Sequence, residues 1–138
     1  MMMKILKDKE KAKSLLKMAE QTEKFLKEIF SSNIIKEHQS MAAMQYYDII
    51  RSLATALLLC KGFKATGENA HKETIDYLSN FKGITILEIE KIQDLRIRRN
   101  KSSYEGKPIE SPYLENNQRN LDLIISKLKS ILTGELRA

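Results

Sequence analysis

The chain has 138 residues, of which 42% are hydrophobic and 30% are charged. This length is enough for one hydrophobic core and too short for two ordinary domains, so we expect a single domain over residues 1–138. With 5 Gly, 2 Pro and no Trp, the composition excludes a disordered chain and favours a compact helical protein over a sheet-rich one. The net charge is +6, and residues 96–107 hold five basic residues against one acidic residue.

The chain carries no sign of secretion or of a membrane span. Charged residues follow the first methionines before an apolar signal core can form, so we expect a cytoplasmic protein. The longest apolar stretch, residues 53–60, is far shorter than the roughly 20 residues that cross a bilayer. The lone Cys60 lies among leucines and is expected to be a small buried hydrophobe. We expect the lysines of residues 1–30 to form a solvated helix face.

The first half of the chain predicts two long helices. Apolar residues recur at three- and four-residue steps from residue 7 to residue 30, which indicates an amphipathic helix. The second predicted helix begins near residue 34 or residue 39 and ends at Gly62. Its second half is apolar on almost every side, so we expect it to be the central core helix. Residues 61–68 contain two glycines and predict a loop.

The second half predicts one short and two long helices. The short helix is expected over about residues 69–80, and a helical stripe begins in residues 84–95, although residues 84–86 are also compatible with a strand. The glycine and proline in residues 105–108 end this helix, and the last helix begins near Tyr113. Four long helices and one short helix joined by short loops predict an all-α fold, namely an antiparallel up-and-down helical bundle.

The basic run of the fourth long helix continues its apolar stripe. Projected at about 100° per residue, the stripe contains Ile89, Ile92 and Leu95, followed by Arg96, Arg99 and Ser103. An arginine on the core side needs a carboxylate, phosphate or carbonyl partner, because burying it unpaired is costly. Asn100 and Tyr104 are four residues apart beside this line, so a guanidinium, an amide and a phenol could converge there.

A structural explanation of the same residues stays open. Arginines on a helix often extend to solvent while their stems cover apolar surface. Here Arg96, Arg98 and Arg99 could also pair with Glu90, Asp94 or Asp48. Spacing by itself does not decide between this explanation and a binding site.

Residues 94–106, DLRIRRNKSSYEG, resemble the signature of HEPN-domain proteins, in which an arginine and an asparagine lead, after a short spacer, to a histidine. Residues 46–64 resemble the second helix and following turn of that family, and His71 is placed like a residue common in archaeal-type members. The similarity covers roughly residues 38–132, with its pieces in the expected order. It identifies the chain as a candidate HEPN domain.

The resemblance implies a helical bundle that dimerises. Many HEPN proteins are ribonucleases of toxin–antitoxin systems or partners of small nucleotidyltransferases. In the ribonucleases the arginine contacts the scissile phosphate, the asparagine positions groups, and the histidine supports in-line attack by the ribose 2′-hydroxyl. These roles carry over to Arg99 and Asn100, whereas the histidine position falls on Tyr104. A phenol with a pKa near 10 is a poorer proton shuttle at neutral pH than an imidazole near 6.5, so binding survives this difference better than catalysis.

The functional expectation is therefore a homodimeric module that binds nucleotide or RNA phosphate and partners a separately encoded nucleotidyltransferase. The binding residues are predicted to be Arg96, Arg99, Asn100, Lys101 and Ser103. Two alternatives are a metal-independent ribonuclease toxin that uses Arg99, Asn100 and Tyr104, and a purely structural assembly module. No cofactor or metal is expected, since His38 and His71 are the only histidines and lack the spacing of a zinc site.

Overall fold

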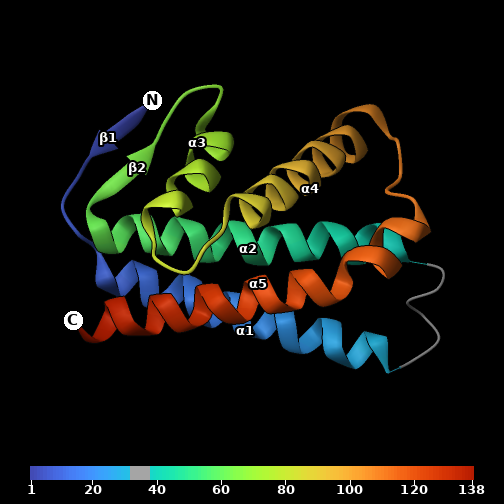
Figure 1. Ribbon diagram of the computed structural model, residues 1–138, viewed down its shortest axis with the longest axis horizontal. Coiled ribbons are helices and arrows are strands. Elements are labelled where there is room, and N and C mark those ends of the chain that lie inside the picture. The colour runs from blue at the N-terminus through green and yellow to red at the C-terminus, as the bar shows by residue number, and fades with distance from the viewer. Residues whose placement is uncertain (32–37) are drawn as a thin grey trace.

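The computed structural model describes residues 1–31 and 38–138, in which helices dominate (Figure 1). The elements in chain order are β1 (Met2–Lys4), α1 (Lys9–Phe30), α2 (Gln39–Lys61), β2 (Phe63–Ala65), α3 (Ala70–Asp76), the 3₁₀ helix η2 (Tyr77–Asn80), α4 (Ile86–Glu105) and α5 (Ser111–Arg137). The all-helical prediction is thus confirmed in its main part, with a small two-stranded sheet in addition. The possible helix start at residue 34 lies outside the described residues.

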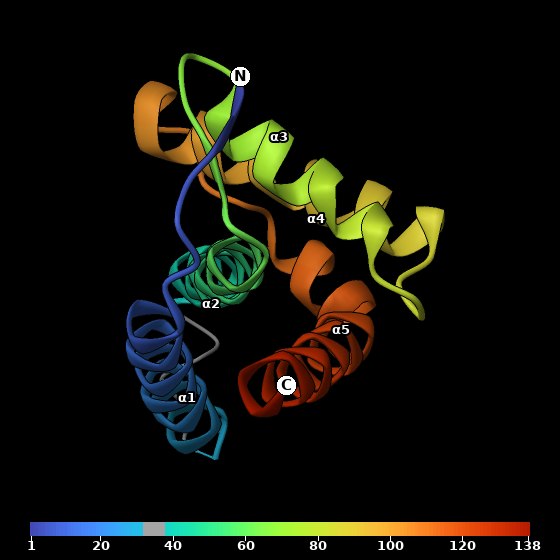
Figure 2. The same cartoon turned by 90° about the vertical axis from the view of Figure 1, so that its left-hand side faces the viewer.

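Helix α2 is the central element of the fold, as its apolar second half predicts. Leu53 and Leu57 are 0% exposed, and α2 packs against α1, α3, α4 and α5. Figure 2 shows α1 and α5 below α2 and the pair α3 and α4 above it. Because neighbours surround this helix, it can be apolar on nearly all sides without exposing an apolar face.

The long helices do not all lie side by side. In Figure 1, α1 runs opposite to α2 and α5, and α4 rises away from α2 toward its C-terminal end. Helix α4 contacts α2 and the α3–η2 segment. Its C-terminal half still contacts α2, since Ser102 Oγ lies 3.6 Å from Met44 Sδ. Because α4 is inclined to the other long helices (Figure 1), a regular four-helix up-and-down bundle stays a prediction.

The predicted loop over residues 61–68 is wrong at its centre, where β2 pairs antiparallel with β1 (Figure 1). Met2 lies opposite Ala65 and Lys4 opposite Phe63. Gly62 ends α2 with a φ of 81°, and its carbonyl accepts a hydrogen bond of 2.8 Å from the Ile5 amide. The sequence around residue 63 could not reveal this strand, since its partner is the distant N-terminal segment.

The alternative strand at residues 84–86 is also wrong, because Thr85 is the N-cap of α4. Its hydroxyl accepts from the Glu88 amide at 3.1 Å, and the Glu88 carboxylate accepts from the Thr85 amide at 2.9 Å. This reciprocal capping box satisfies two backbone donors at the start of the helix. The predicted end is confirmed, since Gly106 terminates α4 in the left-handed region with a φ of 69°.

The remaining local predictions are confirmed or refined. Cys60 is buried at 3% exposure, and burial raises the pKa of its thiol. The predicted short helix is divided into α3 and η2, and the last helix begins at Ser111, two residues earlier than expected. In the described part of the chain, no helix combines the length and the apolar character that crossing a membrane requires.

Candidate functional site

The predicted stripe of α4 divides into an apolar half and a basic half. Ile92 and Leu95 are 0% exposed and pack into the core. Arg96 and Arg99 follow on this side of the helix and are partly buried, as the helical projection predicts. Ser103, which the projection places next on the stripe, is exposed. The core-facing line of α4 therefore ends near Arg99.

Arg99 reaches across to α2, where it meets two consecutive residues. Its Nη2 lies 3.8 Å from Oδ1 of Asp48, and its guanidinium carbon lies 5.8 Å from the centroid of the Tyr47 ring. The side chain of Arg99 is only 19% exposed. Arg99 therefore pairs with Asp48, as the structural explanation expects, but the distance between them is too long for a hydrogen bond.

Three polar atoms at this contact are buried and lack a hydrogen-bond partner among the described residues. They are the Tyr47 hydroxyl, Asp48 Oδ1 and Arg99 Nε. Most buried polar groups in proteins are hydrogen-bonded, and an unpaired one costs about 1–3 kcal/mol. A group of three such atoms within one contact marks a place with unused capacity to bind a polar ligand.

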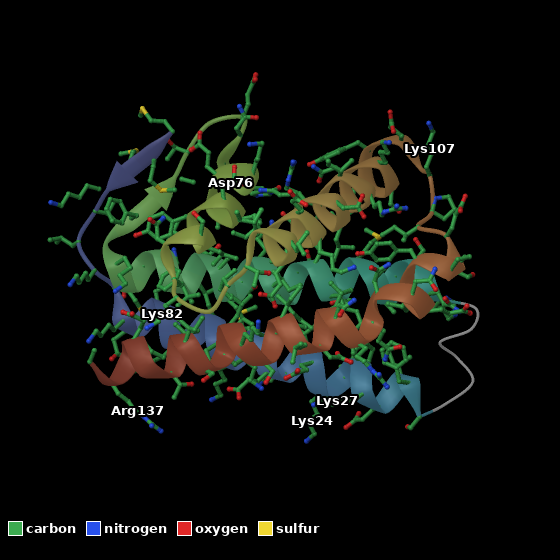
Figure 3. All side chains as sticks on the ribbon, viewed as in Figure 1. Lys24, Lys27, Asp76, Lys82, Lys107 and Arg137 are labelled. Carbon is green, nitrogen blue, oxygen red and sulfur yellow. The ribbon has the colours of Figure 1, made fainter. Side chains whose placement is uncertain are left out.

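Arg96 is held at the junction of α4 and α3. Its Nε donates to Gln93 Oε1 at 2.6 Å, and Gln93 Nε2 donates to the Lys72 carbonyl and to Asp76 Oδ1, both at 2.9 Å. Figure 3 labels Asp76 on α3, beside the first half of α4. The network fixes the Arg96 guanidinium through a neutral amide, so the described residues leave the positive charge of Arg96 without an ion-pair partner.

Arg51 of α2 and His71 of α3 complete the group. Arg51 Nη1 lies 3.4 Å from His71 Nε2, and because a guanidinium only donates, the imidazole nitrogen accepts. Burial lowers the pKa of His71, and the charges of Arg51, Arg99 and Arg96 lower it further, against a smaller opposing effect of Asp48. His71 is therefore neutral at pH 7 and offers Nε2 as an acceptor to Arg51.

The same charges act on the buried phenol of α2. Burial raises the pKa of Tyr47, while Arg51, Arg96 and Arg99 oppose this rise. Charges that act together on two side chains lie close to both of them. We call the set the arginine cluster; its members are Tyr47, Asp48, Arg51, His71, Arg96 and Arg99.

The arginine cluster carries three positive charges and a single carboxylate. Such an excess in a partly buried place attracts anions, and guanidinium groups bind phosphate oxygens in a forked geometry. Within the described ranges, no group of three or more His, Cys, Asp or Glu side chains could hold a metal ion. The chemistry that this arrangement offers is therefore recognition of a phosphate or another anion.

Other predicted site residues lie outside the arginine cluster. Lys101 and Tyr104 are exposed, Tyr104 at 78%. Asn100 is partly buried on α4, and its side chain makes no hydrogen bond with the described residues. Arg98 is exposed, pairs with Asp94 at 2.9 Å and stacks over the Tyr113 ring of α5 at 4.8 Å. No hydrogen bond, ion pair or ring contact joins Arg99, Asn100 and Tyr104 in the described part of the chain, so their expected convergence stays a prediction.

Sequence reasoning named Asp48 of α2 as a possible ion-pair partner of the arginines but missed Arg51 of the same helix. Asp48 and Arg51 are the only charged residues of α2 before Lys61. Two charges in an otherwise apolar and polar-uncharged core helix are a signal, because a buried charge requires a partner or a function. These isolated charges could have identified Arg51 as a candidate site residue, just as the basic run identified Arg99.

Two lysines of α1 lie away from the arginine cluster. Figure 3 labels Lys24 and Lys27 at the edge of the molecule opposite α3 and α4, with Arg137 at the end of α5 on the same edge. Both lysines are exposed, in agreement with the predicted solvated face.

Comparisons with protein-family models, with curated proteins and with solved structures gave no match for this chain. The resemblance to HEPN domains is therefore not tested by these comparisons and stays a prediction.

Proposed function

We propose that this protein is a HEPN-like module that binds the phosphate of a nucleotide or RNA at the arginine cluster. The observation that carries the proposal is the set of three partly buried arginines, Arg51, Arg96 and Arg99, around one carboxylate and a buried phenol without a partner. A phosphodiester would supply the missing negative charge. Both Arg99 Nε and the Tyr47 hydroxyl are covered in the ligand-free structure, so they would donate to the phosphate after the neighbouring side chains move aside.

The cluster favours binding over cleavage. Ribonuclease activity needs a group that moves a proton near the scissile phosphate, and Tyr104 at 78% exposure is not in contact with Arg99. Incubating the pure protein with structured RNA, with Arg99→Ala and Tyr104→Phe as controls, tests the alternative. Cleavage lost in both variants would establish the ribonuclease and overturn this preference.

The proposal includes an up-and-down helical bundle, a homodimer and a separately encoded nucleotidyltransferase as partner. Exposed apolar residues support assembly: Ile86 and Leu87 at the start of α4 are each 74% exposed, and Leu123 of α5 is 55% exposed. Leu87 and Leu123 also line one groove between these helices. Light scattering after gel filtration checks the homodimer, and Leu87→Glu is expected to give a monomer if this surface joins two copies.

The decisive experiment compares two neighbouring arginines. Fluorescence anisotropy of a short labelled single-stranded RNA at low salt would be measured with Arg99→Ala and with Arg98→Ala, which removes the same charge from the outer face of α4. We expect Arg99→Ala to weaken binding by about tenfold or more and Arg98→Ala by less than about twofold. Affinity should also fall as salt is raised, because phosphate contacts release counterions.

Two outcomes would overturn the proposal: no RNA or nucleotide binding at low salt, or equal losses in the two variants. Arg99→Lys keeps the charge but loses the forked geometry, so a partial loss is expected. The structural alternative predicts a different result, in which Arg99→Ala weakens the dimer without any ligand. Gel filtration of Arg99→Ala separates these cases, since the binding proposal expects the dimer to persist.

A further inference from the structure

A pocket of about 390 Å³ lies next to the arginine cluster. Its walls come from α1, α2, α3 and β2; β2 follows the end of α2 and pairs with β1. Of the predicted binding residues on α4, none lines this pocket. Arg51 and His71 border both the pocket and the arginine cluster.

The charged residues of the pocket are all basic. Lys11 of α1, Arg51 of α2 and Lys64 of β2 line it, together with neutral His71, and its lining contains no Asp or Glu. Neither lysine has an ion-pair partner among the described residues. Nearby acids are engaged elsewhere, since Glu10 pairs with Lys13 at 3.2 Å and Glu73 with the N-terminal amine at 2.7 Å. Three cations from three elements thus surround one cavity without neutralisation.

The floor of the pocket is apolar. Leu58 and Leu59 are buried beneath it, and the Phe63 ring forms part of its wall. Ser52 and Thr55 also line it, and their hydroxyls make no hydrogen bond with the described residues. Apolar walls with a few convergent polar groups are typical of small-molecule sites, and a volume near 400 Å³ is within their usual range of about 300–1,000 Å³.

We infer that this pocket binds a small phosphate monoester that carries an apolar or aromatic body, such as a nucleoside monophosphate. Three cations match a doubly charged phosphate better than a single carboxylate. The leucines and the Phe63 ring would contact the body of the ligand, and the two hydroxyls would bind its polar edges. This site goes beyond the proposed function: it shares Arg51 and His71 with the arginine cluster, whereas Lys11, Lys64 and the apolar floor belong to the pocket alone.

Isothermal titration calorimetry with adenosine 5′-monophosphate, adenosine and inorganic phosphate tests the inference. We expect the monophosphate to bind at least about tenfold more tightly than either of the other two, since only it engages both the cations and the floor. Lys11→Ala and Lys64→Ala should each weaken its binding by about threefold to tenfold. The matched control Lys82→Ala, on the exposed turn labelled in Figure 3, and Arg99→Ala should each change it by less than about twofold.

Other outcomes contradict this assignment. Absence of binding, or binding that neither lysine substitution weakens, excludes the pocket. Equal affinities for monophosphate and adenosine exclude anion recognition, and equal affinities for monophosphate and inorganic phosphate exclude a role for the apolar floor. Binding that depends on Arg99 but not on Lys11 or Lys64 would place the ligand in the arginine cluster. That result would overturn this inference while supporting the proposed function. RNA binding indifferent to Arg99 would instead overturn the proposed function, while monophosphate binding that depends on Lys11 and Lys64 would still support this inference.

Discussion

Replacing Tyr47 with phenylalanine removes one oxygen atom from the arginine cluster and keeps the ring. Tyr47 is 0% exposed, and its hydroxyl has no hydrogen-bond partner among the described residues. A buried, unpaired hydroxyl costs about 1–3 kcal/mol. Losing the contacts of the oxygen and weakening the ring's attraction for Arg99, 5.8 Å away, offsets part of this gain, by about 0.5–1 kcal/mol. We therefore expect Tyr47→Phe to raise the free energy of unfolding by about 1 kcal/mol.

Urea unfolding followed by circular dichroism measures this change. If only stability has changed, the slope of the unfolding free energy against urea concentration stays the same. The same substitution should weaken RNA binding severalfold, because the hydroxyl is proposed to donate to the phosphate. Tyr113→Phe is the matched control: its hydroxyl is also buried and unpartnered in the described chain, but it lies beside Arg98. It should raise stability without affecting RNA binding.

A contrasting substitution calibrates the assay. The Tyr46 hydroxyl donates to Asp122 at 2.7 Å, so Tyr46→Phe should lower stability by about 1 kcal/mol or more. If Tyr47→Phe behaved like Tyr46→Phe, the Tyr47 hydroxyl would be hydrogen-bonded in the ligand-free protein. The reasoning that connects this atom to a ligand would then be refuted.

Three further predictions concern stability. Gly62→Ala should lower the free energy of unfolding by more than about 1 kcal/mol, since φ is +81° and the added carbon would lie 2.9 Å from the Ile5 carbonyl oxygen. Gly134→Ala, inside α5 with no atom within 4 Å of the added carbon, should raise it by about 0.5–1 kcal/mol. Thermal unfolding compares the two variants. Thr85→Ala should cost about 1 kcal/mol in urea unfolding by removing the cap of α4. The pKa of His71 is lowered by folding, so stability should be unaffected by this group above about pH 6.5 and should decrease as the pH falls below that value, because the unfolded state then binds more protons. Unfolding free energies at about pH 7.5 and pH 5.5 check this, and His71→Gln should reduce the difference.

The elements of this fold that were predictable are those fixed by neighbouring residues. The spacing of apolar residues located all five α-helices, and the glycines after residues 61 and 105 marked the ends of α2 and α4. The sheet was not predictable in this way. Strand β2 exists because residues 2–4 supply its hydrogen bonds, and a three-residue strand between two glycine turns has no periodicity of its own.

The side chains of the candidate site were also predictable only where neighbouring residues determine their position. Periodicity correctly placed Arg96 and Arg99 at the end of an apolar stripe, because helix geometry alone determines which residues share a face. It could not supply their surroundings, since Asp48 and His71 come from other helices whose packing depends on the whole core. Tyr104 was expected near Arg99 because it is four residues from Asn100, yet the five residues from Arg99 to Tyr104 rotate the chain by about 140°. This rotation is consistent with its exposure on another side of α4.

The position of the charges on α2 connects the core with the site. Asp48 and Arg51 alternate with Ile49, Ile50 and Leu53, which are at most 1% exposed, so the packing that stabilises the fold also fixes the backbone from which both charges extend. Side chains on a rigid, buried helix lose little further entropy when they bind a ligand, which favours affinity. Arg51 also borders the neighbouring pocket. A ligand in that pocket and a phosphate in the arginine cluster would therefore compete for one guanidinium, and occupancy of one site should weaken the other by the same factor in both directions.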